Sequence, residues 1–262
     1  MRNKLLFGLA GAVFGFAGSG FALAADMAVK MPVKAPPPAP VPVYSWTGCH
    51  IGGNVGFGWE RTQESDFLAI PGFNIGSDTG TGVVGGGQIG CDYQTASWVF
   101  GVQGMFDGSG VKGSLVPNGA NSTFNPLGFT PNETHAFNTQ WFATLTGRIG
   151  YVVWPQALLY IKGGAAWAHK TYSDSDPIYL GGYLGTGSAN PNGWTIGGGL
   201  EYAFLPNWSA FVEYNFIDFG TRNVTINYNV PTDIVTNPYA YTFKQNLQTV
   251  LVGLNYRFAG WH

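Results

Sequence analysis

Residues 47–59 read TGCHIGGNVGFGW, and this stretch decides how the rest of the 262-residue chain is interpreted. Its odd positions are mostly apolar and end in Phe57 and Trp59, whereas its even positions are glycine, His50 or Asn54. An alternation with a period of two is typical of a β-strand with one apolar face. The same alternation returns near residue 200 and near the end of the chain. We therefore predict an all-β protein.

The whole sequence contains eight such extended segments, and the gaps between them alternate between long and short. The gaps are 22, 4, 31, 6, 23, 3 and 23 residues long. Short turns at one end and long loops at the other describe an eight-stranded antiparallel up-and-down barrel, the arrangement of bacterial outer-membrane barrels with long extracellular loops and short periplasmic turns. The predicted segments are residues 46–59, 82–93, 98–108, 140–151, 158–169, 193–204, 208–219 and 243–258.

The low content of charged residues separates a membrane barrel from a soluble one. Only 10% of the residues are charged, against roughly 25% in an ordinary soluble domain. The non-apolar face of the segments holds mostly small and neutral polar residues, which suits a narrow lumen, so the apolar face is left for lipid and the sheet must close. A net charge of −2 also argues against a nucleic-acid partner. The seven charged residues predicted to form a polar network in the lumen are Asp92, Asp107, Arg148, Lys162, Glu201, Glu213 and Arg257.

Aromatic residues gather at both ends of the predicted strands. Amphipathic rings favour the two membrane interfaces, so we predict two aromatic girdles. Aromatic residues of a soluble core, the alternative, would occupy mid-strand positions as often as strand ends. The tryptophans of the predicted girdles are Trp46, Trp59, Trp98, Trp141, Trp154, Trp167, Trp194 and Trp208.

The N-terminal region has the layout of a secretory signal. Arg2 and Lys4 precede an uncharged run that closes with Ala22-Leu23-Ala24, so residues 1–24 are predicted to be a signal peptide; a retained transmembrane helix is the alternative. Residues 25–43 are rich in proline and are expected to form a solvated periplasmic spacer, with a tether to peptidoglycan as the alternative. The barrel is assigned to residues 44–258 and a tail to residues 259–262.

The two cysteines admit a prediction about strand register. If Trp59 pairs with Thr81, then Cys49 lies opposite Cys91 on the same face near the short-turn end. The bacterial periplasm is oxidising, and neighbouring strands bring Cα atoms close enough for a disulfide. We predict a Cys49–Cys91 disulfide; the alternative is two free cysteines that face lipid as small apolar residues.

Several motifs resemble a known family. The run YSWTGCHIGGNVG at residues 44–56, GGQIG at residues 86–90 and VGLNYRF at residues 252–258 resemble the small outer-membrane β-barrel proteins of alphaproteobacteria, often called outer-membrane immunogenic or RopB-type proteins. The resemblance implies a barrel in the bacterial outer membrane, surface exposure, porin-family membership in some annotations and no enzymatic activity. It also implies a terminal strand signature for the assembly machinery at Leu254, Tyr256 and Phe258, although here residues 259–262 follow Phe258.

Two uses of the lumen are compatible with the sequence. An eight-stranded barrel is just wide enough for its own side chains, so the charged network is expected to neutralise itself as a plug. The same residues would line a narrow-pore porin for small solutes in the alternative. Adhesion or receptor binding through the long loops is a third interpretation, because residues 109–139 and 220–242 are rich in Asn, Thr, Gly, Pro and Tyr.

Histidines next to acidic residues are the remaining candidates for chemistry. Glu133 with His135, and His169 with Asp174 and Asp176, are conceivable metal ligands or acid–base pairs, but they lie on loops or strand rims where solvated polar residues are expected. We predict no catalytic residue, cofactor or metal. The expected protein is a monomer, with outer-membrane lipid, lipopolysaccharide and the assembly machinery as partners, that serves envelope integrity and surface display.

Overall fold

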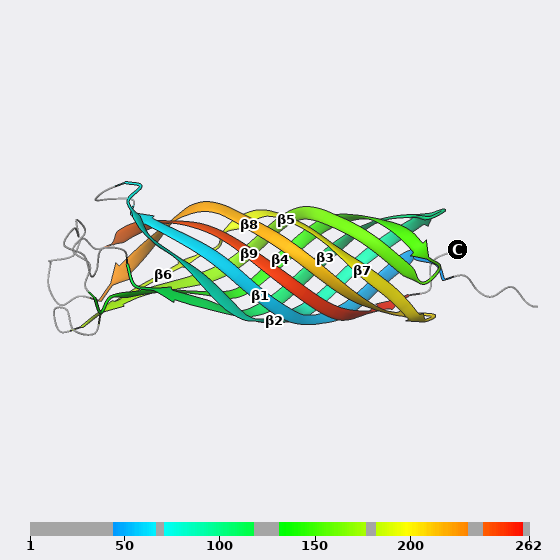
Figure 1. Cartoon of the computed structure of the whole chain (residues 1–262), viewed down its shortest axis with the longest axis horizontal. Coiled ribbons are helices and arrows are strands. Elements are labelled where there is room, and N and C mark those ends of the chain that lie inside the picture. The colour runs from blue at the N-terminus through cyan, green and yellow to red at the C-terminus, as the bar shows by residue number, and fades with distance from the viewer. Residues whose placement is uncertain (1–43, 67–70, 118–130, 177–181, 230–237, 259–262) are drawn as a thin grey trace, which may run out of the picture. The chain divides into compact units, whose positions relative to one another are not determined.

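The computed structural model describes residues 44–66, 71–117, 131–176, 182–229 and 238–258. The predicted signal peptide, the proline-rich spacer and the C-terminal tail lie outside these residues. Nine antiparallel strands form one sheet that closes on itself (Figure 1). The strands are β1 (Gly48–Asp66), β2 (Asn74–Thr95), β3 (Trp98–Leu115), β4 (Thr134–Trp154), β5 (Ala157–Asp176), β6 (Tyr183–Ala189), β7 (Asn192–Leu205), β8 (Trp208–Tyr228) and β9 (Tyr239–Arg257).

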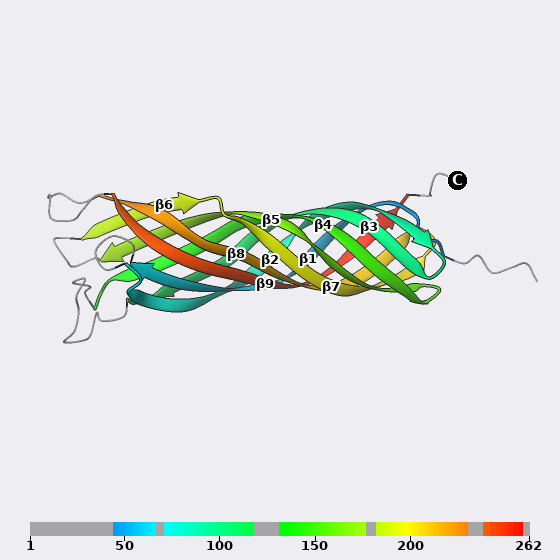
Figure 2. The ribbon, with the colours of Figure 1, turned by 90° about the horizontal axis from the view of Figure 1, so that it is seen from above.

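The ring has eight positions because β6 and β7 share one of them. Both strands pair with β5 on one side and β8 on the other, and only Asn190 and Pro191 separate them. Proline cannot donate a ladder hydrogen bond, so the strand is interrupted at this point. Strand β1 pairs with β9 and closes the ring, as the two perpendicular views in Figures 1 and 2 agree. The predicted eight-stranded up-and-down barrel is confirmed.

The strands are longer than predicted, and the loops are correspondingly shorter. Strand β2, for example, spans 22 residues, whereas the sequence predicted residues 82–93. Residues 224–228, which lie beyond the predicted segment 208–219, continue β8 as far as Tyr228. Beyond most of the predicted boundaries the outward face of the strands is polar, and the inward face mixes acidic with apolar residues. The regular apolar alternation that marks a strand is therefore weakened there.

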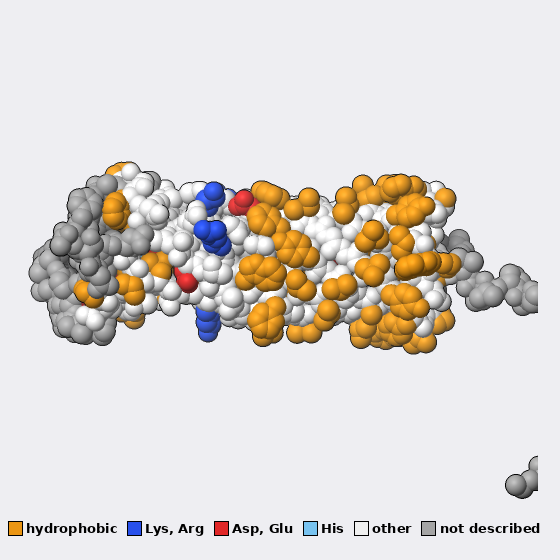
Figure 3. Space-filling model, viewed as in Figure 1, with side chains coloured by type: hydrophobic (Ala, Val, Ile, Leu, Met, Phe, Trp, Pro, Cys, Tyr) orange, Lys and Arg blue, Asp and Glu red, His pale blue; other side chains and the backbone are white. Residues whose placement is uncertain are grey.

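The outer surface divides into two parts along the barrel (Figure 3). Exposed apolar side chains cover the half next to the short turns, and polar side chains cover the half next to the long loops. We name these parts the apolar band and the extension. The strand segments from the short turns to the level of Trp59, Trp141, Trp167 and Trp194 carry the apolar band and are those expected to span the membrane. None of the described residues belongs to a helix long and apolar enough to cross a membrane.

Seven of the eight predicted girdle tryptophans lie on the outward face or at the turns, but Trp46 does not. Trp46 is completely buried and packs with Val99, Leu158 and Tyr160 inside the short-turn end of the barrel. Its position was wrongly predicted because it precedes β1, where the chain turns inward and parity along a strand no longer applies. The indole lies under Arg257, whose Cζ is 5.4 Å from the ring centroid.

The predicted register between β1 and β2 is observed. Trp59 pairs with Thr81, and Cys49 pairs with Cys91. The two cysteines are joined by a disulfide on the outer face of these strands, close to the short-turn end. On the last strand, Leu254 and Phe258 are exposed on the outward face, and Tyr256 contacts the rings of Trp208 and Phe258.

Candidate functional site

The interior of the barrel carries its polar chemistry at three levels, and the first lies at the short-turn end. Asp92 of β2 accepts hydrogen bonds from Nε of Arg148, at 2.7 Å, and from Nη1 of Arg257, at 2.9 Å. Arg148 also donates from Nη1 to Glu201 of β7 at 3.1 Å. His50 Nδ1 lies 3.4 Å from the same Asp92 carboxylate. All of these side chains are buried, and each of the arginine ion pairs joins two strands that are not neighbours in the sheet.

A second part of this network lies beside the first. Lys162 Nζ is 2.6 Å from Glu213 and donates to Gln103 at 3.1 Å, and Tyr160 donates to Glu213 at 2.8 Å. Six of the seven predicted lumen charges therefore come together. The seventh, Asp107, is fully buried but joins no ion pair with the residues that the structure describes.

An apolar layer fills the lumen above these ion pairs. Among its largest members are Phe142 of β4 and Phe219 of β8, which project inward. Above them, buried Lys170 pairs with Glu60, and the Lys170 ammonium lies 4.3 Å from the ring centroid of Phe219. The apolar layer and this buried ion pair together fill this part of the lumen.

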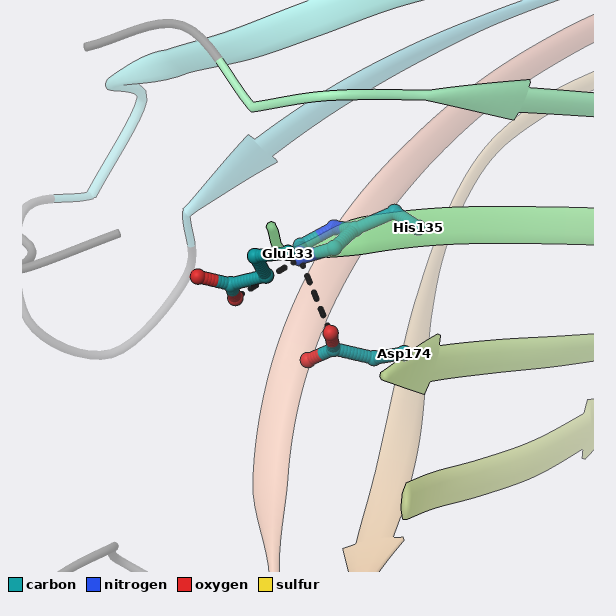
Figure 4. Close-up of side chains that lie close together, drawn as sticks. All are labelled: Glu133, His135 and Asp174. Atoms are coloured by element: carbon teal, nitrogen blue, oxygen red, sulfur yellow. Dashed lines mark hydrogen bonds and ion pairs between the residues drawn. The ribbon is translucent and has the colours of Figure 1, made fainter. Parts of the chain in front are cut away.

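The third level is a histidine surrounded by carboxylates near the long loops (Figure 4). His135, at the start of β4, places Nδ1 2.8 Å from Glu64 of β1. Its Nε2 lies 3.1 Å from Glu133 and 3.3 Å from Asp174 of β5. Tyr228 donates a hydrogen bond to Asp174 and lies 3.1 Å from the hydroxyl of Tyr241. We name Glu64, Glu133, His135 and Asp174 the upper cluster.

The electrostatics of the upper cluster favour a protonated histidine. It lies in the extension, outside the segments expected to span the membrane. Burial by itself lowers the pKa of His135, but the charge of Glu64 and the hydrogen bonds of both ring nitrogens to carboxylates raise it well above its usual value. Burial raises the pKa of Asp174 to about 6, against the opposing effect of His135. One imidazolium thus partly neutralises three carboxyl groups.

The same geometry is compatible with a metal ion. One ligand atom from each of Glu133, His135 and Asp174 lies within 4.8 Å of the others, and Glu64 would orient the imidazole from its other nitrogen, as carboxylates do behind metal-bound histidines. A cavity of about 20 Å³ adjoins Glu64, His135 and Asp174, enough for one water molecule. The arrangement satisfies the carboxylates with a proton just as well, so the geometry alone does not require a metal.

The residues of the upper cluster were only partly identified from the sequence, and Asp174 was paired with the wrong histidine. His135 was associated with Glu133, and both lie in the cluster, whereas Asp174 was associated with His169. In the structure His169 faces outward, stacks on Trp141 and lies 2.6 Å from Asn190. Glu60, Glu64 and Lys170 were missed. Even-numbered residues from Glu60 to Asp66 continue the inward parity of His50 and Asn54, and that parity identifies Glu60 and Glu64. Lys170 likewise continues the inward parity of Lys162 on β5.

Comparisons with known proteins also indicate an outer-membrane barrel. A sequence model described as an outer membrane protein beta-barrel domain matches residues 21–258. The 31 kDa outer-membrane immunogenic protein of Brucella melitensis is 35% identical over 248 residues, which cover 90% of this chain and 93% of that protein. The 25 kDa outer-membrane immunogenic protein of Brucella abortus is 28% identical over 92% of both chains.

A solved structure shares the fold at low sequence identity. The outer membrane protease OmpT from Escherichia coli aligns with a TM-score of 0.52 and 10% identity, and the alignment covers 84% of this chain and 99% of that one. At this identity the likeness concerns the fold alone.

Proposed function

Because this chain belongs to the outer membrane protein beta-barrel domain family and is accordingly a bacterial outer-membrane protein, we propose that it is a non-conducting, non-enzymatic barrel serving envelope integrity and surface display. The observation that carries the proposal is the filled lumen. Its three levels consist of buried side chains, most of which are paired with one another or packed against apolar neighbours. A solute would have to separate Arg148 from Asp92 and then pass Phe142 and Phe219.

The state of His135 supports the absence of enzymatic activity. A histidine acts as a general base or acid through a ring nitrogen that reaches the substrate. Here Nδ1 is engaged by Glu64, and Nε2 by Glu133 and Asp174. OmpT is by name a protease, but the upper cluster holds its histidine in mutual ion pairs rather than presenting it to a ligand.

Planar-bilayer recording on the folded protein tests whether the lumen conducts. The expected result for the native protein is no steady unit conductance. F142A/F219A removes two large rings from the apolar layer and is expected to produce conductance, which shows that the assay can detect a path. The matched control F106A removes an exposed ring from the outer face and should resemble the native protein. Steady conductance of the native protein would favour the narrow-pore porin instead.

Surface display is proposed from the names of the relatives, which are called immunogenic outer-membrane proteins. The test is antibody labelling of intact cells that express the chain with an epitope inserted at residue 124, between β3 and β4. Labelling of intact cells is expected. Labelling that appears only after the cells are permeabilised would contradict surface exposure. An epitope inserted in the turn at Pro155 and Gln156, at the opposite end of the barrel, provides the control, because it should be labelled only after permeabilisation.

A further inference from the structure

Charged side chains are sorted by sign between the inside and the outside of the barrel. Among the described residues, ten of twelve carboxylate side chains are buried, and the other two, Asp78 and Asp218, are half-buried. Of eight described Lys and Arg residues, four are buried and four are exposed. The exposed four, which we name the basic ring, are Arg61, Lys112, Arg222 and Lys244.

The strand register places the basic ring at one level around much of the barrel. Lys244 on β9 faces Gln63 of β1 on one side and Thr221 of β8 on the other, so Arg61 and Arg222 are its near neighbours on the adjacent strands. Lys112 lies on β3 and faces Thr81, which in turn faces Trp59, two residues before Arg61 on β1. Figure 3 shows Lys and Arg side chains lined up across the barrel at the border of the hydrophobic surface.

Aromatic residues fix the position of this level relative to a membrane. Trp59 lies two residues below Arg61 on β1 and is one of the four tryptophans that end the apolar band on the long-loop side. Outward-facing aromatic residues mark the interface between hydrocarbon and headgroups. In outer-membrane barrels the long loops are extracellular, so the basic ring lies among the headgroups of the outer leaflet.

We propose that the basic ring binds the phosphate groups of lipopolysaccharide in the outer leaflet. Phosphates are the anions available at headgroup depth, and each Lys or Arg near an anionic lipid surface strengthens binding about fivefold. Opposing charge is scarce, because Asp78 and Asp218 are the only described carboxylate residues that are not buried, and both are half-buried. Asp218 also accepts a hydrogen bond from the Gly220 N–H at 2.7 Å.

One member of the ring is held in position by the barrel. Arg222 donates from Nη2 to the backbone oxygen of Asn192 at 3.0 Å and to its side-chain oxygen at 2.7 Å. Asn192 starts β7 just after the interruption at Pro191. The interruption therefore places two acceptors where they orient a guanidinium toward the outer surface, and guanidinium groups suit bidentate phosphate binding. The proposal does not depend on whether the lumen conducts.

The test compares the folded native protein with the variant R61Q/K112Q/R222Q/K244Q, which keeps a polar side chain at each position but removes four charges. Binding of lipopolysaccharide to the detergent-solubilised barrel is titrated in the presence of EDTA, so that bridging divalent cations do not contribute. A second titration uses lipopolysaccharide from which the lipid A phosphates have been removed, and a third adds inorganic phosphate as a competitor. The matched control Q63A/T79A/S114A/T225A changes four exposed, uncharged neighbours.

The expected result is that the native protein and the control bind phosphorylated lipopolysaccharide at least about tenfold more tightly than the charge variant. All three should bind the dephosphorylated form equally weakly, and inorganic phosphate should compete only at far higher concentration than the lipid. Equal affinity of the native protein and the charge variant, or no preference of the native protein for phosphorylated lipid, would overturn the proposal. Folding is checked by heat-dependent mobility on SDS gels, and R61Q/K244Q replaces the fourfold variant if that does not fold.

Discussion

At the scale of single residues, Arg148 is the side chain on which the interior most depends. It contacts Asp92 and Glu201, which are both buried and which come from strands on either side of it in the ring. Replacing it leaves two carboxylates without their principal partner in a site from which water is excluded. Removal of one partner from a buried ion pair costs about 3–5 kcal/mol.

We therefore expect Arg148→Ala to lower the free energy of unfolding by about 3–5 kcal/mol. The measurement is urea unfolding in detergent followed by tryptophan fluorescence. Thr79→Ala, on the outer surface of the extension, serves as the control and should change stability by less than about 0.5 kcal/mol. A loss for Arg148→Ala no greater than that of the control would mean that the lumen network contributes nothing measurable.

The upper cluster makes stability depend on pH. The pKa of His135 is raised in the folded protein, so its stabilising contribution is complete below the unfolded value of about 6.5 and is lost as the pH rises through the higher folded value. The raised pKa of Asp174, about 6, acts in the same direction at lower pH, because ionising a carboxyl group that prefers to be neutral costs stability.

The expected outcome is a melting temperature that falls as the pH is raised from 5 to 9, with a smaller fall in His135→Gln. Asp174→Asn should remove the part of the fall below about pH 6 and leave the part above it. Equal slopes for the native protein and His135→Gln between pH 6.5 and 9 would show that His135 does not carry a stabilising proton.

At the scale of strands, the sequence predicts the strand segments whose two faces meet different surroundings, lipid on one side and the lumen on the other. Between Cys49 and Trp59 one face of β1 meets lipid and the other meets the lumen, and the contrast produces a visible alternation. From Glu60 to Asp66 the inward residues are acidic or polar and the outward residues are Arg61, Gln63 and Ser65, so the contrast disappears. The lumen charges of the apolar band were predicted for the same reason, whereas Glu60 and Lys170 were not.

No comparable sequence pattern marks the interruption between β6 and β7, which share one position of the ring, or the burial of Trp46. Pro191 marks a break, but β6 before it is rich in glycine and small polar residues and lacks an apolar face. The mutual arrangement of Glu64, His135 and Asp174 depends on the register of β1, β4 and β5, which shifts between Glu64 and Ser65 and between Thr139 and Trp141. Nothing within any one strand determines it.

The extension is expected to be separable from the apolar band. Asn223 pairs with Thr242, so replacing residues 224–241 with the turn Gly-Asn-Gly shortens β8 and β9 without altering the apolar band. We expect this variant to fold and to retain heat-dependent mobility on SDS gels. Its melting temperature should fall, because Ile226, Tyr228 and Tyr241 leave the upper aromatic packing. A deletion of residues 216–248, which enters the apolar band, is the control that should fail to fold.

The disulfide between β1 and β2 gives a second prediction at this scale. Its cysteines are 42 residues apart in sequence, and cross-links of this kind stabilise by about 2–4 kcal/mol. C49S/C91S should lower the free energy of unfolding by that amount, and dithiothreitol should affect the native protein but not the variant. Non-reducing peptide mapping checks the bond itself, and recovery of both thiols free from exported protein would contradict it.

At the scale of the whole molecule, the apolar band determines the solvent that the protein needs. Outward-facing Ile51, Phe57 and Leu254 are about half exposed, as are many side chains around the same half of the barrel. Contiguous apolar surface of this extent is not tolerated in water. Dilution below the critical micelle concentration should therefore cause the processed protein to aggregate, as measured by sedimentation. A compact monomer that stays dissolved without detergent would contradict the membrane assignment.

The pairing of β1 with β9 has a consequence for biosynthesis. Asp66 meets Tyr241 and His50 meets Arg257, so the seam of the cylinder joins the earliest strand to the last. The backbone amides on the free side of β1 have no strand partner until almost the entire polypeptide has been exported, and hydrocarbon does not tolerate such an edge. A chain that ends before β9 therefore has two unpaired sheet edges. We expect such a chain to be degraded in the periplasm and not to form a smaller barrel.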